Sequence, residues 1–140
     1  MATIQASETD SEFLSAPRIG VLIVNTSNQE PRGIPVWFEW DGSTIAFFSA
    51  HDSSKVSYLS AGQPVSFVVS NTADESSLWF AFDGTAEVHD SGALELAERL
   101  AHRYWSMEED EHKSLLASWR EHADALCRVV ITPTRIRTGS

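Results

Sequence analysis

The sequence predicts an α+β domain that is mainly antiparallel β. Five segments typical of β-strands come before any long helical segment, and the short links between them favour antiparallel neighbours. Two helical segments and a sixth strand follow. A chain of 140 residues can bury one hydrophobic core but has little room for a second domain. A large active site would therefore need a second subunit.

The predicted strands are rich in β-branched and aromatic residues and are separated by turn signals such as Asp41-Gly42. Residues 1–12 are expected to form a flexible arm, and residues 13–140 the folded domain. A short helix through Phe13 should end before Pro17. Strands are expected over residues 19–25, 34–40, 44–50, 65–71 and 77–89, with a polar loop over residues 27–33.

The first and fifth strands have different apolar patterns. Residues 77–89 alternate, which predicts one face in the core and one mostly in water. Residues 19–24 are apolar on both faces, so they are expected to be covered twice. A barrel interior on one side and a dimer partner on the other would provide that cover.

After Asp90 the apolar residues recur at helical spacing, which predicts two amphipathic helices. The first is expected over residues 94–104, and the second is expected to start at the acidic residues 108–111 and to include the apolar residues from Leu115 to Ala123. One or two helical turns are also expected over residues 53–59, between the third and fourth strands. The last strand should run over residues 126–132 and end at Pro133.

The chain is strongly acidic, with 10 Lys and Arg against 20 Asp and Glu and a formal net charge of −10. Phosphate backbones and anionic membranes are bound by clustered cations, so neither nucleic acid nor a membrane is an expected partner. No segment has signal-peptide or membrane-spanning length, which predicts a cytoplasmic protein. The single cysteine, Cys127, is expected to pack in the core. The five histidines are not spaced as one metal site, so no metal is expected.

One polar cluster follows the third predicted strand. Ser49, Ser53 and Ser54 supply hydroxyl groups, Lys55 supplies a positive charge, and the start of a short helix supplies free N–H groups. This chemistry suits a phosphate group. The alternative, favoured by the local sequence alone, is that Ser54 caps the helix and Lys55 is solvated.

A second candidate site is the aromatic strand around Pro35, Val36, Trp37 and Phe38. Such a strand offers backbone donors and acceptors and flat apolar surface to a planar heterocycle. The alternative is that these aromatic residues belong to the core, as aromatic residues in strands usually do.

Seven segments of the chain, taken in order, carry a resemblance to a known family. They are residues 17–22, 33–38, 47–59, 64–69, 82–88, 103–105 and 128–136. This ordered set resembles the pyridoxamine 5′-phosphate oxidase-like family of FMN-binding split β-barrels. No single segment is specific, but together they extend over about residues 13 to 137.

The resemblance implies a six-stranded antiparallel split β-barrel with flanking helices. It also implies a homodimer that binds FMN, or the deazaflavin F420 in related subfamilies, in a groove at the subunit interface. By the same resemblance, Ser54 and Lys55 would contact the phosphate, Ser49 would lie near the ribityl chain or phosphate, and residues 35–38 would border the isoalloxazine ring. Trp79 and Trp105 would lie on the substrate side or against the partner subunit.

The expected function is that of a small flavin-binding oxidoreductase that transfers hydride or electrons to a small acceptor. No side chain stands out as a catalytic acid or base, as expected where the cofactor carries the redox chemistry. One alternative is an F420-dependent reductase, although only Arg18, Arg32 and Lys55 are basic in the first 90 residues to hold its polyanionic tail. Another is a flavin-binding or stress-related protein without turnover.

The doubly apolar first strand makes a prediction about assembly. We expect the protein to sediment as a dimer at micromolar concentration, because a second copy would cover the outer face of residues 19–24. Sedimentation velocity measures this directly, and a clean monomer would remove the dimer-interface groove from the hypothesis.

Overall fold

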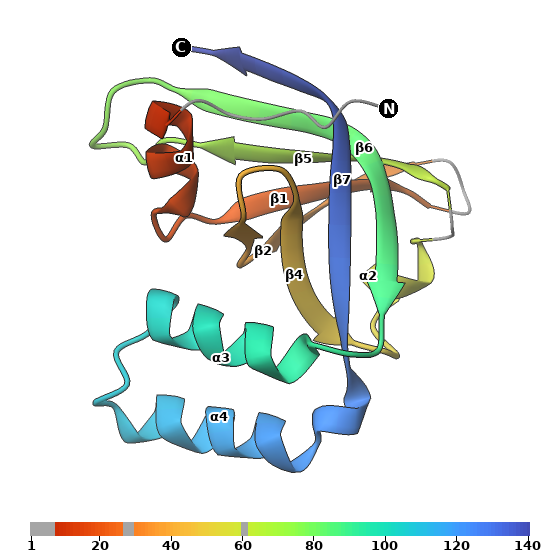
Figure 1. The fold of residues 1–140 in the computed structure, drawn as a ribbon, viewed down its shortest axis with the longest axis vertical. Coiled ribbons are helices and arrows are strands. Elements are labelled where there is room, and N and C mark those ends of the chain that lie inside the picture. The colour runs from red at the N-terminus through yellow and green to blue at the C-terminus, as the bar shows by residue number, and fades with distance from the viewer. Residues whose placement is uncertain (1–7, 27–29, 60–61) are drawn as a thin grey trace.

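The computed structural model describes residues 8–26, 30–59 and 62–140, and Figure 1 shows a strongly curved sheet with two helices packed below it. The helices are α1 (Glu8–Ser15), α2 (Ser54–Ser57), α3 (Ala93–Tyr104) and α4 (Asp110–Glu121). The strands are β1 (Gly20–Asn25), β2 (Pro31–Val36), β3 (Glu39–Trp40), β4 (Ile45–Ala50), β5 (Pro64–Ser70), β6 (Trp79–His89) and β7 (Leu126–Gly139).

The seven strands form one antiparallel sheet in the order β2-β1-β5-β6-β7-β4-β3. The sheet curls into a half-barrel in which β2 and β3 are the two edges (Figure 1). This confirms the prediction of a mainly β domain with helices. The concave side holds the core, where the largest fully buried aromatic side chains are Phe38, Phe47, Phe67, Phe80 and Phe82.

The prediction of six strands was wrong, because residues 34–40 form two strands. β2 pairs with β1 as far as Val36, whereas β3 pairs with β4 through Glu39 and Trp40. Trp37 and Phe38 lie between them. The Phe38 ring enters the core and meets Phe67 at 5.3 Å between ring centroids. The chain therefore changes partners at the two aromatic residues that made this segment look continuous.

The polar loop predicted over residues 27–33 is shorter than expected. Residues 27–29 lie outside the described residues, but Pro31 already pairs with Asn25 as the first residue of β2. β2 is an edge strand, where the missing N–H of a proline can face away from the ladder. Edge prolines also discourage pairing with further strands.

The last strand does not end at Pro133 but continues to Gly139. A bulge lies where β6 and β7 shift register, with Gly84 opposite Pro133. A proline is tolerated at a bulge, because the ladder is already interrupted there. A Cβ atom at Gly84 would clash with the backbone carbonyl of Thr132, so this close approach requires glycine.

The outer face of β1 is only partly covered in one chain. Leu22 and Val24 face the core and are buried, whereas Val21 and Ile23 on the other face are partly exposed. Ile19, just before the strand, is 52% exposed. The inner cover predicted for this segment is confirmed, and cover of the outer face by a second copy stays a prediction.

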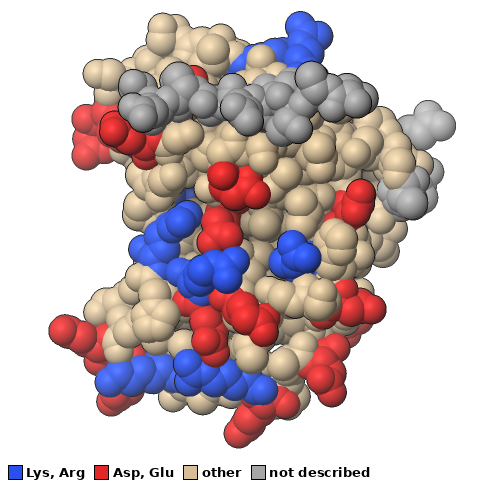
Figure 2. Space-filling model, in the orientation of Figure 1, with Lys and Arg blue, Asp and Glu red and all other residues tan. Residues whose placement is uncertain are grey.

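The two predicted long helices are confirmed and form the layer below the sheet (Figure 1). α3 packs against β4 and β7 and buries Leu96 and Leu100, whereas α4 packs against α3 and buries Leu116. Figure 2 shows charged side chains of both signs gathered over these helices. None of the helices in the described part of the chain is long and apolar enough to cross a membrane.

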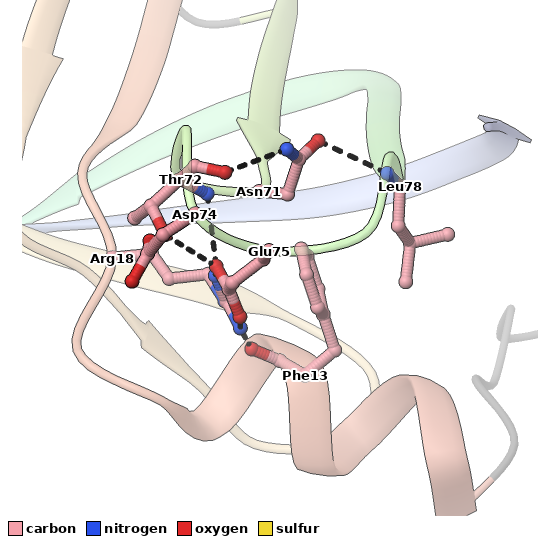
Figure 3. A network of polar contacts seen from close by, with 7 residues as sticks. All are labelled: Phe13, Arg18, Asn71, Thr72, Asp74, Glu75 and Leu78. Carbon is pink, nitrogen blue, oxygen red and sulfur yellow. Dashed lines mark hydrogen bonds and ion pairs between the residues drawn. The ribbon is translucent and has the colours of Figure 1, made fainter.

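Near the N-terminus, Arg18 joins α1 to the loop between β5 and β6 (Figure 3). Its Nε donates to the carbonyl of Phe13 at 2.9 Å, and its guanidinium lies 3.7 Å above the Phe13 ring centroid. Both terminal nitrogens bond the carboxylate of Glu75. The same carboxylate accepts from the backbone N–H and the hydroxyl of Thr72. α1, which begins inside the segment predicted as an arm, is thus fixed at its end.

This contact predicts a pH dependence of stability. The hydrogen bond from Arg18 and those from Thr72 lower the pKa of Glu75 from 4.5 to about 2. Because the folded-state pKa is the lower one, the stabilisation is fully present above pH 4.5 and is lost as the pH falls towards 2. We expect Glu75→Gln to remove this part of the acid sensitivity. The measurement is denaturant unfolding between pH 6 and 2, and equal pH profiles for the two proteins would contradict the assignment.

Candidate functional site

A groove of about 340 Å³ opens beside the edge strand β2. β2 and the residue after it contribute to its lining, as do β4, α2 and α4, and Ile19 lies just before β1. The residues that line it are Ile19, Pro35, Val36, Trp37, Phe48, Lys55 and Trp119. The groove thus lies where the curved sheet fails to close. Its volume is at the lower end of the roughly 300–1,000 Å³ typical of small-molecule sites.

Lys55 is held by the buried hydroxyl of Ser49, which is itself paired with the hydroxyl of Ser53. Its Nζ donates to Ser49 Oγ at 3.1 Å, and Ser49 Oγ lies 2.8 Å from Ser53 Oγ. Ser49 is only 5% exposed. Ser53, rather than Ser54, occupies the cap position of α2, and its side chain makes no cap hydrogen bond because it bonds Ser49. The alternative of an ordinary cap and a solvated lysine therefore does not describe this turn.

The predicted site residues do not all reach the groove. Pro35, Val36, Trp37 and Lys55 line it, and Ser49 is joined to it through Lys55. Ser54 is exposed, and its carbonyl accepts a hydrogen bond from the Ser57 hydroxyl at 2.6 Å. Phe38 is fully buried. For this residue the alternative interpretation holds, in which the aromatic side chain belongs to the core.

The two tryptophans named for the substrate side lie in different places. Trp79 is 37% exposed and pairs across β6 and β7 with Gly139. Trp105 packs edge-on to Trp37, with 4.7 Å between ring centroids, and stacks on Trp119 at 5.4 Å. Trp105 thus supports two of the aromatic residues that line the groove.

Sequence reasoning did not assign Ile19, Phe48 or Trp119 to the site. Phe48 meets Trp119 edge to face, with ring centroids 5.2 Å apart. Trp119 belongs to the apolar pattern of α4, and nothing in that pattern separates a groove residue from a core residue. Only the tertiary packing of α4 on α3, which in turn packs on β4, brings the two rings together.

The hydroxyl of Tyr104 holds the wall of the groove in place. It donates to the carbonyl of Arg18 at 2.6 Å and accepts from the backbone N–H of Phe38 at 3.4 Å. The Tyr104 ring stacks on Trp37, with 4.9 Å between centroids and an interplanar angle of 10°. Burial is the main cause that raises the pKa of this phenol, so its proton stays in place.

Few charged groups face the groove. Among the described residues that line it, Lys55 is the one with a charge. His112 stacks on Trp105 at 4.4 Å but lies outside the lining, with Nδ1 2.8 Å from the carbonyl of Ser106. In the described part of the chain, no three His, Cys, Asp or Glu side chains are placed to hold a metal ion. The groove is suited to bind an apolar ring and one anionic group.

A half-open antiparallel barrel with a groove at its unclosed edge defines a split-barrel domain. The family model described as pyridoxamine 5′-phosphate oxidase matches residues 6–138, so the chain belongs to this family. This confirms the resemblance seen in the sequence. No curated protein sequence matches the chain.

Solved structures share the fold at low sequence identity. An F420 reductase is 18% identical, with a TM-score of 0.73, over 94% of this chain and 98% of the other. A conserved hypothetical protein from Mycobacterium tuberculosis is 22% identical, with a TM-score of 0.72, over 99% and 87% of the two chains. An FAD-binding protein from Mycobacterium smegmatis is 18% identical, with a TM-score of 0.63, over 98% and 100%. These similarities extend over the whole domain and establish the fold.

The Tyr104 contacts predict a stability effect. We expect Tyr104→Phe to lower the free energy of unfolding by about 1–3 kcal/mol, because the partly buried N–H of Phe38 and carbonyl of Arg18 lose a partner. The ring that stacks on Trp37 is kept. Denaturant unfolding measures the change.

Tyr58→Phe is the matched control, because the hydroxyl of Tyr58 accepts a bond from Arg32 at 3.3 Å on the exposed surface. This variant should change the free energy of unfolding by no more than about 0.5 kcal/mol. Equal effects of the two substitutions would show that the Tyr104 hydroxyl does not hold the groove wall.

Proposed function

We propose that the chain is a small flavin-binding oxidoreductase that binds FMN in the groove at a dimer interface. The phosphate lies at the cluster of Ser49, Ser53 and Lys55, and the isoalloxazine ring lies against residues 35–37. The observation that carries this proposal is the position of Lys55, which lines an otherwise apolar groove and donates to the buried hydroxyl of Ser49.

The donor groups at Lys55 fit a phosphate monoester. An ammonium group has three N–H donors, and the bond to Ser49 uses one of them. Hydrogen bonds between a cation and a phosphate oxygen are shorter and stronger than neutral ones. Ser49 is buried and accepts a hydrogen bond from Lys55. It therefore orients the ammonium group, whose other donors remain available to a ligand. Ser54, although exposed, lies in the same turn and remains a proposed phosphate contact.

The apolar lining of the groove fits a planar ring. Trp37 and Phe48 supply flat apolar surface, and Trp37 is fixed from two sides by Tyr104 and Trp105. Val36 is the last residue of an edge strand, so its backbone lies at the open side of the sheet. Phe38 contributes indirectly in this arrangement, because its buried ring anchors the chain immediately after Trp37.

A second copy of the chain would complete the site. The groove in one chain is small for a whole flavin nucleotide, and Ile19 leads from it to the partly exposed apolar residues Val21 and Ile23. Burying this face against its own symmetry mate would cover the apolar surface and close the groove at once. This supports the dimer that the sequence predicts.

When bound, the flavin supplies the hydride and electron transfer chemistry, with a reduced nicotinamide as the proposed donor and a small molecule as acceptor. The chain's own residues bind the phosphate, orient the ring and exclude water from it. We propose no catalytic acid or base, since Lys55 is the charged residue among the described groove lining and is engaged with Ser49.

Two other cofactors are the alternatives to FMN. The structure that is 18% identical to this chain with a TM-score of 0.73 is an F420 reductase, and another neighbour is an FAD-binding protein. F420 carries a longer polyanionic tail and FAD a second phosphate. FMN is favoured because Lys55 is a single cation at the described groove.

The proposal predicts the effect of removing the cation. We expect Lys55→Ala to weaken FMN binding by about 1–3 kcal/mol, which is roughly 5- to 150-fold in Kd, because a charge-assisted hydrogen bond to phosphate is lost. Fluorescence titration of the purified protein with FMN measures this. Lys113→Ala, at the chain's other lysine on the exposed side of α4, should leave the Kd unchanged.

Parallel titrations with F420 and FAD separate the alternatives. Tighter binding of F420 than of FMN would make an F420-dependent reductase the better assignment. Binding of FMN without reduction by NADH or NADPH would favour a flavin-binding protein that does not turn over. An unchanged Kd for FMN in Lys55→Ala would overturn the phosphate site.

A further inference from the structure

We propose that Arg18 is a positioning residue for the groove, because its side chain fixes the backbone carbonyl that holds the Tyr104 hydroxyl. The inference rests on the proposed function where FMN binding is measured. The contacts that carry it are present in the ligand-free chain, so its effect on the groove wall is measurable without a ligand.

The side chain of Arg18 is almost completely buried, although it carries a charge. Its exposed fraction is 9%, whereas that of its partner Glu75 is 38%. A buried charge costs free energy unless it is paired and hydrogen-bonded, and a buried ion pair often stabilises no more than apolar residues of similar volume. Stability alone therefore does not explain an arginine at this position, whereas a role in fixing one geometry does.

Two residues hold the Arg18 guanidinium in one orientation (Figure 3). Its Nε donates to the carbonyl of Phe13 at 2.9 Å, and the group lies 3.7 Å from the centroid of the Phe13 ring. The two terminal nitrogens bond the two carboxylate oxygens of Glu75, one of them at 2.7 Å. A bidentate pair of this kind fixes direction as well as distance. We call these contacts of Arg18 with Phe13 and Glu75 the Arg18 clamp.

The loop that carries Glu75 is closed by its own hydrogen bonds. The Glu75 carboxylate accepts from the backbone N–H of Thr72 at 2.8 Å, and the backbone N–H of Glu75 donates to the Thr72 carbonyl at 3.1 Å. The side-chain oxygen of Asn71 accepts from the N–H of Leu78 at 3.0 Å, and the Asn71 N–H donates to the Leu78 carbonyl at 2.9 Å. Arg18 therefore pairs with a loop that hydrogen bonds already hold in one shape.

The backbone of Arg18 connects the Arg18 clamp with the groove. Its carbonyl accepts from the hydroxyl of Tyr104 at 2.6 Å, and the next residue, Ile19, lines the groove. The same hydroxyl accepts from the N–H of Phe38 at 3.4 Å, and the Tyr104 ring stacks on Trp37. A rotation of the peptide group between Arg18 and Ile19 would move the acceptor of Tyr104. The clamp opposes this rotation because it holds the side chain of the same residue.

Arg18→Met tests the clamp in the ligand-free protein, because methionine is long and apolar but cannot bond Glu75. We expect the amide of Phe38 to exchange with solvent roughly 2- to 30-fold faster, since its acceptor Tyr104 is less firmly held. Hydrogen exchange followed by NMR measures this. The amide of Phe82, on the central strand β6, is the internal reference. A general loss of stability would speed both amides by the same factor, and that result would overturn the assignment.

The same variant tests ligand binding. We expect Arg18→Met to raise the Kd for FMN roughly 2- to 30-fold in a fluorescence titration. In a Tyr104→Phe background it should add little, because the hydroxyl through which Arg18 acts is already absent. Fully additive effects of the two substitutions would show that Arg18 does not act through Tyr104 and would overturn the inference.

Glu75→Gln breaks the clamp from the other side and separates positioning from charge. Arg18→Met removes a positive charge and Glu75→Gln a negative one. A long-range charge effect on anionic FMN would therefore weaken binding in the first variant and strengthen it in the second. We expect weaker binding in both. Tighter FMN binding by Glu75→Gln would overturn the inference, and this variant also decides it if Arg18→Met does not fold.

Glu98→Gln is the matched control for Glu75→Gln. It also removes the carboxylate that faces one arginine, but the Glu98 pair with Arg120 joins α3 and α4 at the surface. The control should leave the Kd for FMN and the exchange of Phe38 relative to Phe82 unchanged. Equal effects of the two glutamine variants would overturn the specific role of the Arg18 clamp.

The two measurements separate this inference from the proposed function. If the unmodified protein does not bind FMN, the proposed function fails, and the exchange of Phe38 relative to Phe82 alone decides whether Arg18 positions the groove wall. If FMN binds and its Kd is unchanged in Arg18→Met, the inference is overturned and the proposed function stands.

Discussion

The hydroxyl of Tyr104 connects the parts of the chain that make the groove. It ties the end of α3 to the backbone at Arg18, before β1, and at Phe38, between β2 and β3. At that point the chain leaves one edge of the sheet and starts the other. Because the Tyr104 ring also stacks on Trp37, the same residue fixes the backbone where the chain changes strand partner and the side chain that lines the groove there. The split of the barrel and the wall of the groove are thus one local arrangement.

The distribution of charge makes the groove distinct from the rest of this acidic chain. The chain has 20 acidic residues, and among the described residues four of them pair with arginines, as Glu39 does with Arg99. Exposed pairs of this kind contribute little to stability. Lys55 differs because it is joined to the buried hydroxyl of Ser49 at an apolar groove. A single cation in such surroundings suits one anionic group much better than two.

Family membership and the site carry different kinds of information. The match over residues 6–138 and the shared fold of the solved structures fix the architecture. Split barrels of one shape can hold different cofactors and acceptors, since these depend on the few side chains at the open edge. In this chain those side chains are mainly aromatic, with Phe48 on β4 and Trp119 on α4 supplying the far wall. The fold alone therefore does not fix which cofactor this groove binds.

The sequence by itself determined the elements whose signals are local. The alternation of β6, the helical spacing of α3 and α4 and the turn at Asp41-Gly42 depend on neighbouring residues, and so does the candidate site at residues 49–55. Tertiary structure decided what depends on distant partners. Phe38 leaves the strand because the core accepts its ring, and β7 passes Pro133 because Gly84 allows a bulge opposite it. Trp119 joins the groove because α4 packs on α3 and so brings the Trp119 ring to Phe48, whereas the sequence pattern of α4 is that of any amphipathic helix.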